Sequence, residues 1–206
     1  MEVAPQNIRN SSHLDSKPSN ASANELIRFA ISQNFLGRML VASSEKGVCA
    51  VLLGDNARAL IADLHSRFPT AKLRRGDAEL EASVARIALA IETPESTLSV
   101  SLDPRGTALQ QRIWRALREI PMGSTASYQE IAKNLDISTT AQAVAEACAA
   151  NAIAILVPCH RVVRRDGSLA GYRWGIKRKR ALLQKEQEIS PEPGSLFHAA
   201  AFAAHR

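Results

Sequence analysis

The spacing of apolar residues predicts the secondary structure of the first half of the chain. Two apolar runs, 37–43 and 48–53, flank the polar segment 44–47, which is typical of a β-hairpin. Apolar residues then recur at helical spacing over 56–67 and 79–91. The side chains that form these two stripes are Leu60, Ile61, Leu64 and Phe68, followed by Leu80, Val84, Ile87 and Ile91.

An alternating segment and a turn signal place a domain boundary near the middle of the chain. Residues 97–102 alternate apolar and polar side chains and predict a strand. Residues 103–106, Asp-Pro-Arg-Gly, end it. We therefore expect four regions: a disordered leader (1–24), an α/β domain (25–103), a mostly helical domain (104–189) and a flexible tail (190–206).

Three possible capping boxes indicate helix starts in the second half. In each, a Ser or Thr is followed three residues later by Gln or Glu, and they begin at Thr107, Ser127 and Thr139. The first precedes a stripe of Leu109, Ile113, Leu117 and Ile120. The other two begin short helices that end near Leu135 and Ala150. Their separation is typical of a helix-turn-helix, although two packed core helices would share it.

The segment after this pair combines a short apolar run, turns and a last helix. Residues 153–157 are apolar but too few to classify. Residues 165–175 are rich in turn formers, and 176–188 are expected to form a helix.

Composition excludes several classes of protein. Of the 206 residues, 46% are hydrophobic, which is enough for a packed core, yet no apolar run reaches the roughly 18 residues of a membrane span. The polar N-terminus lacks the apolar centre of a signal peptide. The cysteines, Cys49, Cys148 and Cys159, form neither a disulfide framework nor a zinc-ligand spacing. These features predict a cytoplasmic protein in a reducing compartment, with no membrane partner.

Excess positive charge is confined to the end of the chain. Residues 158–206 hold ten Lys and Arg against four Asp and Glu, whereas residues 1–157 hold sixteen of each, and the net charge is +6. A solvated basic surface would give this balance, and so would a face that binds phosphates.

One cysteine has neighbours suited to chemistry. A cysteine reacts as a thiolate, which nearby cations or a base favour. Cys159 is followed by His160, Arg161, Arg164 and Arg165. A buried thiol beside a surface histidine would give the same pair, and on an extended strand the two side chains would point to opposite faces.

These residues extend into a longer pattern that resembles a known family. Residues 158–163, Pro-Cys-His-Arg-Val-Val, are similar to the active-site signature of the methylated-DNA–protein-cysteine methyltransferases. Further matching segments are Gly106–Ala108, Gln110–Gln111, Trp114, Ala116–Leu117, Ile120–Pro121, Ser127–Tyr128, Cys148–Asn151, Gly171–Gly175, Gly37–Arg38, Leu40–Val41 and Leu52–Gly54. The likeness covers about residues 25–188 and is strongest to the C-terminal methyltransferase half of a bacterial adaptive-response member of the family.

The resemblance implies a role for five residues. Cys159 would accept the methyl group, His160 would act as base through a water, and Glu186 would hold His160. Asn151 would shape the turn that carries Cys159. Tyr128 would donate a proton or hydrogen bond to the departing base and would crowd the phosphate of the flipped nucleotide.

The resemblance also implies the reaction, the partner and the fold. The thiolate would displace guanine at an alkyl carbon on its O6 atom, or thymine at O4, and the thioether product would consume the protein. No metal or organic cofactor is required. The partner would be double-stranded DNA, bound through the minor groove with the damaged nucleotide flipped out. The fold would be α+β: a small ribonuclease-H-like domain with an antiparallel sheet, then a winged helix-turn-helix, in a monomer.

The residues expected to contact substrate or DNA lie on the second helix and beyond Cys159. They are Ala141, Gln142, Ala145, Arg161, Val162, Tyr172, Arg173 and Trp174. Tyr172 and Trp174 would line the base pocket together with backbone near Cys159 and Val162.

The sequence departs from the family on this helix. Gln142 stands where the family has an arginine that fills the space of the flipped base, and Glu146 replaces a small residue one turn later. A carboxylate is repelled by the negative groove. Direct reversal of O6-alkylguanine damage is therefore our main hypothesis. A lesion sensor with weak transfer, and a transferase acting on free bases or single strands, are the alternatives.

Overall fold

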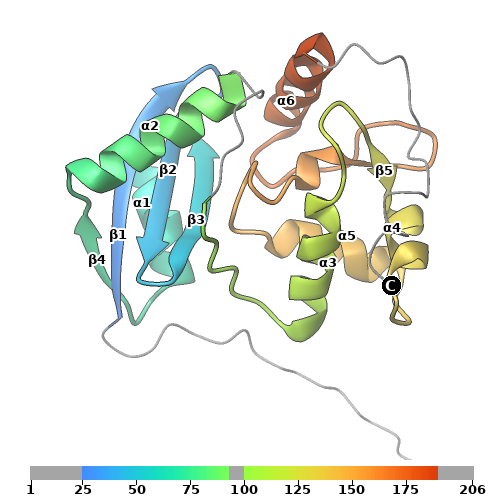
Figure 1. Ribbon diagram of the computed structural model, residues 1–206, viewed down its shortest axis with the longest axis horizontal. Coiled ribbons are helices and arrows are strands. Elements are labelled where there is room, and N and C mark those ends of the chain that lie inside the picture. Colours follow the sequence, from blue (N-terminus) through green and yellow to red (C-terminus); the bar gives the residue numbers. More distant parts are fainter. Residues whose placement is uncertain (1–24, 93–99, 190–206) are drawn as a thin grey trace, which may run out of the picture.

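The structure is a computed structural model that describes residues 25–92 and 100–189, so the predicted leader and tail lie outside the described residues. A sheet with two helices forms one part of the molecule, and a cluster of shorter helices forms the other (Figure 1). The expected α+β class, with strands in the first half and helices in the second, is confirmed.

The predicted hairpin is confirmed as the centre of a four-stranded sheet. Strands β2 (Gly37–Ser44) and β3 (Gly47–Gly54) pair antiparallel, and β1 (Leu26–Asn34) pairs antiparallel with β2. The short strand β4 (Lys72–Arg75) adds to β1 in parallel, giving the order β3-β2-β1-β4. The sequence pattern missed β1 and β4, because neither has the regular alternation that marks a half-buried strand.

Helices α1 (Ala57–Arg67) and α2 (Ala78–Glu92) lie on opposite sides of this sheet (Figure 1). Since both faces are covered, strands β2 and β3 are buried almost continuously. Asn56 caps α1 by accepting hydrogen bonds from two backbone N–H groups. The predicted stripes are buried at Leu60, Leu64 and Phe68, while Ile61 is 36% exposed, so that member of the stripe was wrong.

The predicted strand at 97–102 is not a regular strand in its described part. Residues 93–99 lie outside the described residues, and Leu102 makes only an isolated bridge with Val48 of β3. Arg105 then forms ion pairs with Glu25 and Asp103, at 2.5 and 2.6 Å. The segment before the helical part is thus held to the sheet.

Helix α3 (Ala108–Arg118) begins with the predicted capping box, in which Thr107 and Gln110 exchange hydrogen bonds. Its stripe is buried except at Leu109, which is 38% exposed, so that part of the prediction was wrong. Trp114 of α3 donates its indole N–H to the carbonyl oxygen of Ala147 at 2.9 Å. A Cβ at Gly106 would lie 2.5 Å from the Trp114 ring, so this position requires glycine.

Helices α4 (Tyr128–Asn134) and α5 (Ala141–Ala150) pack together as the predicted helix-turn-helix. The capping box at Ser127 is confirmed. The one at Thr139 is wrong: Thr140 caps α5 instead, accepting a hydrogen bond from the backbone N–H of Ala143. Two adjacent threonines precede this helix, and the capping pattern alone selects the wrong one.

The reactive segment follows α5 and joins both parts of the molecule. Residues 152–154 extend the edge of β3 through two hydrogen bonds with the backbone of Val51, each 2.9 Å. A 3-10 turn (Cys159–Arg161) and the strand β6 (Val162–Val163) come next, and β6 pairs in parallel with β5 (Ala126–Ser127). Helix α6 (Ile176–Ile189) completes the fold, close to its predicted bounds.

Within the described residues, no helix is both long and apolar enough to cross a membrane.

Candidate active site

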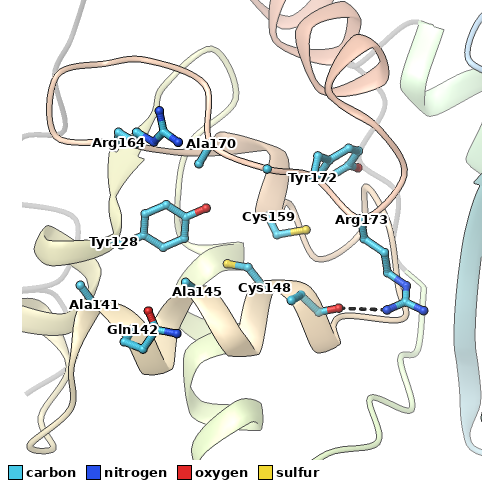
Figure 2. Close-up of a pocket in the computed structure, with 12 residues that line it drawn as sticks. Tyr128, Ala141, Gln142, Ala145, Cys148, Cys159, Arg164, Ala170, Tyr172 and Arg173 are labelled. Atoms are coloured by element: carbon cyan, nitrogen blue, oxygen red, sulfur yellow. Dashed lines mark hydrogen bonds between the residues drawn. The ribbon is translucent and has the colours of Figure 1, made fainter.

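A cavity of about 700 Å³ opens between α5 and the segment that runs from Cys159 to Arg173 (Figure 2). Its lining combines small side chains, two cysteines, two tyrosines and two arginines. The lining residues are Tyr128, Ala141, Gln142, Ala145, Cys148, Ala149, Cys159, Arg164, Ala170, Gly171, Tyr172 and Arg173. Seven of the thirteen residues predicted for the site line this cavity: Tyr128, Ala141, Gln142, Ala145, Cys159, Tyr172 and Arg173.

Cys159 lies at the inner wall of this cavity and is only 4% exposed. The 3-10 turn places it directly before β6, so it does not lie on an extended strand. Asn151 holds this turn: its amide Nδ2 donates to the carbonyl oxygen of Val157 at 2.9 Å and to Sγ of Cys159 at 3.2 Å. These two hydrogen bonds are what the expected role of Asn151 in shaping the turn would require.

Burial raises the pKa of the Cys159 thiol to about 11, although the Asn151 hydrogen bond and the charge of Lys179 act in the opposite direction. The expectation that neighbouring arginines would favour the thiolate is therefore wrong for the resting protein. Desolvation outweighs the nearby cations, so the thiol is protonated near neutral pH and needs a base.

His160 and Glu186 form a buried pair, and His160 directly follows Cys159 in the chain. Nε2 of His160 lies 2.7 Å from Oε1 of Glu186, and the histidine is fully buried. Hydrogen bonds from His160 and Arg161 outweigh burial and lower the pKa of Glu186 to about 2. Burial lowers the pKa of His160 below its ordinary value, in spite of the Glu186 carboxylate.

These charges fix the tautomer of the histidine. A carboxylate only accepts hydrogen bonds, so Nε2 of His160 carries the proton and Nδ1 has a free lone pair. Nδ1 is buried, and none of the described residues bonds to it. The pair thus keeps an unprotonated ring nitrogen in the interior, on the residue that follows Cys159.

Arg161 does not line the cavity, although the sequence placed it among the substrate contacts. Its guanidinium donates to both carboxylate oxygens of Glu186 at 3.0–3.2 Å and to the carbonyl oxygen of Ile120 at 2.6 Å. Arg161 therefore lies behind the cavity and fixes the orientation of Glu186. Its neighbour in sequence, Val162, is fully buried.

A buried lysine that the sequence did not single out is close to the thiol. Lys179 of α6 is fully buried, and its ammonium donates to the carbonyl oxygens of Val162 and Ala170, the latter at 3.5 Å. Burial lowers its pKa, and the charge of Lys179 favours the thiolate of Cys159. In the helical pattern of 176–188, Lys179 resembled any other basic surface residue, so no signal marked it.

The two tyrosines occupy different walls of the cavity. Tyr128, the first residue of α4, faces the cavity across from α5, and burial raises its pKa to about 12, which keeps the phenol protonated. Tyr172 lies edge-on to Trp174, with ring centroids 5.1 Å apart. Trp174 is buried next to Tyr172 and does not line the cavity, although from the sequence it was expected in the base pocket.

The outer turn of α5 carries the two departures from the family pattern. Gln142 is exposed at the cavity and donates its amide to Oε1 of Glu146 at 3.0 Å. Ala141 and Ala145 flank it on the cavity side.

Five lining residues are outside the predicted set of site residues: Cys148, Ala149, Arg164, Ala170 and Gly171. The spacing of Cys148 from Ala141 and Ala145 along α5 places all three on one face, and this signal could have found it. Arg164 is exposed at the cavity, while Arg173 is anchored by hydrogen bonds to Ala149 and Asp63.

Within residues 25–92 and 100–189, no three His, Cys, Asp or Glu side chains are grouped closely enough to hold a metal ion.

Comparisons with known proteins relate the chain to one family. The family model described as 6-O-methylguanine DNA methyltransferase, DNA binding domain, matches residues 108–188. The chain is 48% identical over 165 residues to the regulatory protein Ada of Salmonella typhimurium, covering 80% of the chain and 47% of that protein. It therefore spans about half the length of this relative.

A shorter relative is matched over most of its length. The inducible methylated-DNA–protein-cysteine methyltransferase of Bacillus subtilis is 37% identical over 155 residues, which cover 74% of the chain and 86% of the relative. The crystal structure of Mycobacterium tuberculosis O6-methylguanine methyltransferase superimposes with a TM-score of 0.65 at 33% identity, covering 81% of the chain and 96% of that structure. The chain belongs to the methylated-DNA–protein-cysteine methyltransferase family.

Proposed function

We propose that this protein repairs DNA by transferring an alkyl group from O6-alkylguanine, and from O4-alkylthymine, to Sγ of Cys159. The observation that carries the proposal is the buried set Cys159, His160 and Glu186, whose thiol opens onto the cavity. Since a thioether has no ready second step, each molecule would act once.

The reaction begins with removal of the thiol proton. Nδ1 of His160, which Glu186 holds unprotonated, takes this proton through a bridging water. The thiolate attacks the alkyl carbon, the new S–C bond forms, and the C–O bond to the base breaks. The developing imidazolium is stabilised by the Glu186 carboxylate, which remains ionised because its pKa is about 2.

The departing base leaves as an anion and needs a donor. Tyr128 retains its proton, since its pKa is raised to about 12, and it faces the cavity that would hold the base. Tyr128 would therefore donate a hydrogen bond or proton as the C–O bond breaks. The cavity of about 700 Å³ is within the usual range for a bound small molecule.

DNA would approach along α5. The family match over residues 108–188 carries the description of a DNA-binding domain, and a related Mycobacterium tuberculosis protein has been solved in complex with DNA at 32% identity and a TM-score of 0.62. The alanines of α5 permit close approach to the minor groove, and Arg164 supplies an exposed cation at the cavity. The damaged nucleotide would rotate out of the stack into the cavity.

A transfer assay tests this proposal. After incubation with duplex DNA that carries labelled O6-methylguanine, label should move to the protein, and mass spectrometry should find one methyl group on the peptide containing Cys159. The Cys159→Ala variant should accept none. Cys49→Ala is the matched control, because Cys49 is buried in the sheet core, and it should keep transfer. A methyl group on another cysteine would refute the assignment.

The Gln142–Glu146 hydrogen bond favours a second candidate, a lesion-binding protein with weak transfer. In that case the protein would bind alkylated duplex DNA while little label moved within the same incubation. Comparing transfer from free O6-alkylguanine, single strands and duplex DNA separates a defect in duplex handling from a defect in thiol chemistry.

A further inference from the structure

The cavity contains a second thiol whose presence the transfer reaction does not require. Cys148 lies on the last turns of α5, lines the cavity and is partly exposed. The transfer reaction uses Cys159 alone.

Both cysteines line the same cavity from facing elements. In Figure 2 the side chain of Cys148 extends from α5 and that of Cys159 from the turn across from this helix, and both sulfur atoms lie between these two elements. The charge of a Cys159 thiolate acts on the pKa of Cys148, so the two groups are close enough to interact. Asn151 connects the two residues, since its backbone N–H donates to the carbonyl oxygen of Cys148 at 3.4 Å and its side chain donates to Sγ of Cys159 at 3.2 Å. Cys49, in contrast, is bonded to the Ala42 carbonyl oxygen within the sheet.

We propose that Cys148 and Cys159 form a thiol–disulfide exchange site, which low-molecular-weight disulfides convert into an internal disulfide. The cavity admits a small disulfide to both thiols. The bond occupies the sulfur that accepts the alkyl group, so the oxidised protein is inactive and a thiol reductant restores it.

The exchange occurs in two balanced steps. The thiolate of Cys159 attacks one sulfur of the small disulfide, forming a mixed disulfide and releasing one small thiolate, which takes up the proton that Cys159 lost. The thiolate of Cys148 then attacks Sγ of Cys159, the mixed disulfide breaks, and a second small thiol departs. Both cysteines are oxidised, and one disulfide reagent is reduced to two thiols.

The order of attack follows from the two environments. Cys159 has the hydrogen bond from Asn151, which favours its thiolate, whereas the pKa of Cys148 is raised further above its ordinary value, by burial and by the charge of Cys159. The charge of a Cys159 thiolate raises the pKa of Cys148 further, and this effect ends once Cys159 is in a mixed disulfide. Cys148 is therefore the resolving thiol.

Oxidised glutathione on the full chain tests the proposal. Wild-type protein should lose two of its three free thiols, retain no glutathione, and give a disulfide-linked pair of peptides that contain Cys148 and Cys159. Dithiothreitol should restore all three thiols. The Cys148→Ala and Cys148→Ser variants should instead hold one glutathione on Cys159, and Cys49→Ala should behave as wild type in forming the bond.

Two readouts separate this inference from the proposed function. Peptide mapping reports the disulfide whether or not the protein transfers alkyl groups, while loss of transfer on oxidation rests on the proposed function. Glutathione retained on wild-type Cys159, a disulfide that includes Cys49, or three unreacted thiols would overturn the inference. Two Cys148 variants are used so that misfolding of one does not decide the result.

Discussion

At the scale of single residues, the environment of Cys159 determines when the thiol reacts. Burial raises its pKa to about 11, so the ionised fraction near neutral pH is small. In the proposed mechanism, reactivity then depends on a neutral His160, which is bonded to Glu186, and Glu186 is in turn bonded to Arg161. Glu186 is bonded to both His160 and Arg161, and its loss would leave Nε2 of the buried His160 without its partner.

The pH dependence of transfer should reveal this arrangement. Burial lowers the pKa of His160 below 6.5, so the histidine stays neutral until the pH falls through that lowered value. The single-turnover rate should therefore be level near neutrality and fall only on the acid side of pH 6.5. Glu186, with a pKa of about 2, should add no change near pH 4 to 5. A rate already falling at pH 7 would contradict a neutral resting histidine.

Substitution of the pair should slow chemistry and not DNA binding. We expect His160→Ala and Glu186→Gln to reduce the single-turnover rate by about 10²–10⁴-fold, the usual contribution of a positioned acid–base group. DNA affinity should change little, because neither side chain lines the cavity. Thermal melting is needed as a control, since both residues are buried. An unchanged rate in either folded variant refutes the proton relay.

At the scale of elements, helix α5 carries Gln142 and Glu146, the two residues that the sequence resemblance marks as departures from the family pattern. Gln142 and Glu146 are one turn apart and bonded to each other, which holds Gln142 along the helix. Thr140 caps α5, so Gln142 has no capping role. The capping-box pattern of Thr139-x-x-Gln142 is therefore not used in the structure.

We expect Gln142→Arg to speed transfer from duplex DNA and to leave the reaction with free O6-alkylguanine nearly unchanged. An arginine would occupy the vacated space in the stack and meet the negative groove, offsetting part of an unstacking cost of a few kcal/mol. Glu146→Ser should act in the same direction by removing a like charge near phosphates. The two changes share a contact and are expected to couple.

The free base serves as the control in this experiment, because it needs no unstacking. Equal acceleration of both substrates would indicate an effect on the thiol or the cavity. No acceleration in a stably folded Gln142→Arg protein would mean that other contacts flip the base.

Elements with a strong local signal were predictable, and those defined by distant contacts were not. The hairpin and the caps of α3 and α4 depend on residues a few positions apart, which a pattern shows directly. Strand β4 is defined by its pairing with β1. Burial of Lys179 is compensated by hydrogen bonds from its ammonium to the carbonyl oxygens of Val162 in β6 and of Ala170. Such partners lie elsewhere in the sequence, so no local pattern identifies them.

The candidate site shows the same division. Cys159, His160 and Glu186 came from the family resemblance, and the structure pairs Glu186 with His160, the residue next to Cys159. Arg161 was expected among the substrate and DNA contacts, but its guanidinium bonds to Glu186 instead. Its place next to the reactive pair in sequence does not determine which side of the 3-10 turn its side chain takes.

At the scale of the whole molecule, the sheet half supports the reactive segment. The edge of β3 bonds to residues 152–154, and Arg173 at the cavity reaches Asp63 of α1 at 3.4 Å. Arg178 of α6 donates to the carbonyl oxygen of Leu36 at 2.7 Å, and α6 lies beside the sheet half (Figure 1). The first half thus orients a site to which it contributes no lining residue.

Arg178 is the strongest of these links and provides the last prediction. Its guanidinium donates to the carbonyl oxygens of Leu36 and Trp174, at 2.7 and 3.0 Å, and to Asp55 at 2.6 Å. The side chain of Arg178 is 18% exposed, whereas that of Asp55 is 87% exposed, so the carbonyl bonds are better shielded from water than the ion pair.

We expect Arg178→Met to lower the free energy of unfolding by about 1–3 kcal/mol, because charged hydrogen bonds are lost while the aliphatic stem is kept. The melting temperature should fall by several degrees. Asp55→Asn is the matched control: it weakens only the exposed ion pair and should cost less than about 1 kcal/mol. Thermal melting of both variants, together with their single-turnover rates, measures the link. If Arg178→Met costs no more than Asp55→Asn, the carbonyl bonds do not join the halves, and the contact between β3 and residues 152–154 must hold them instead.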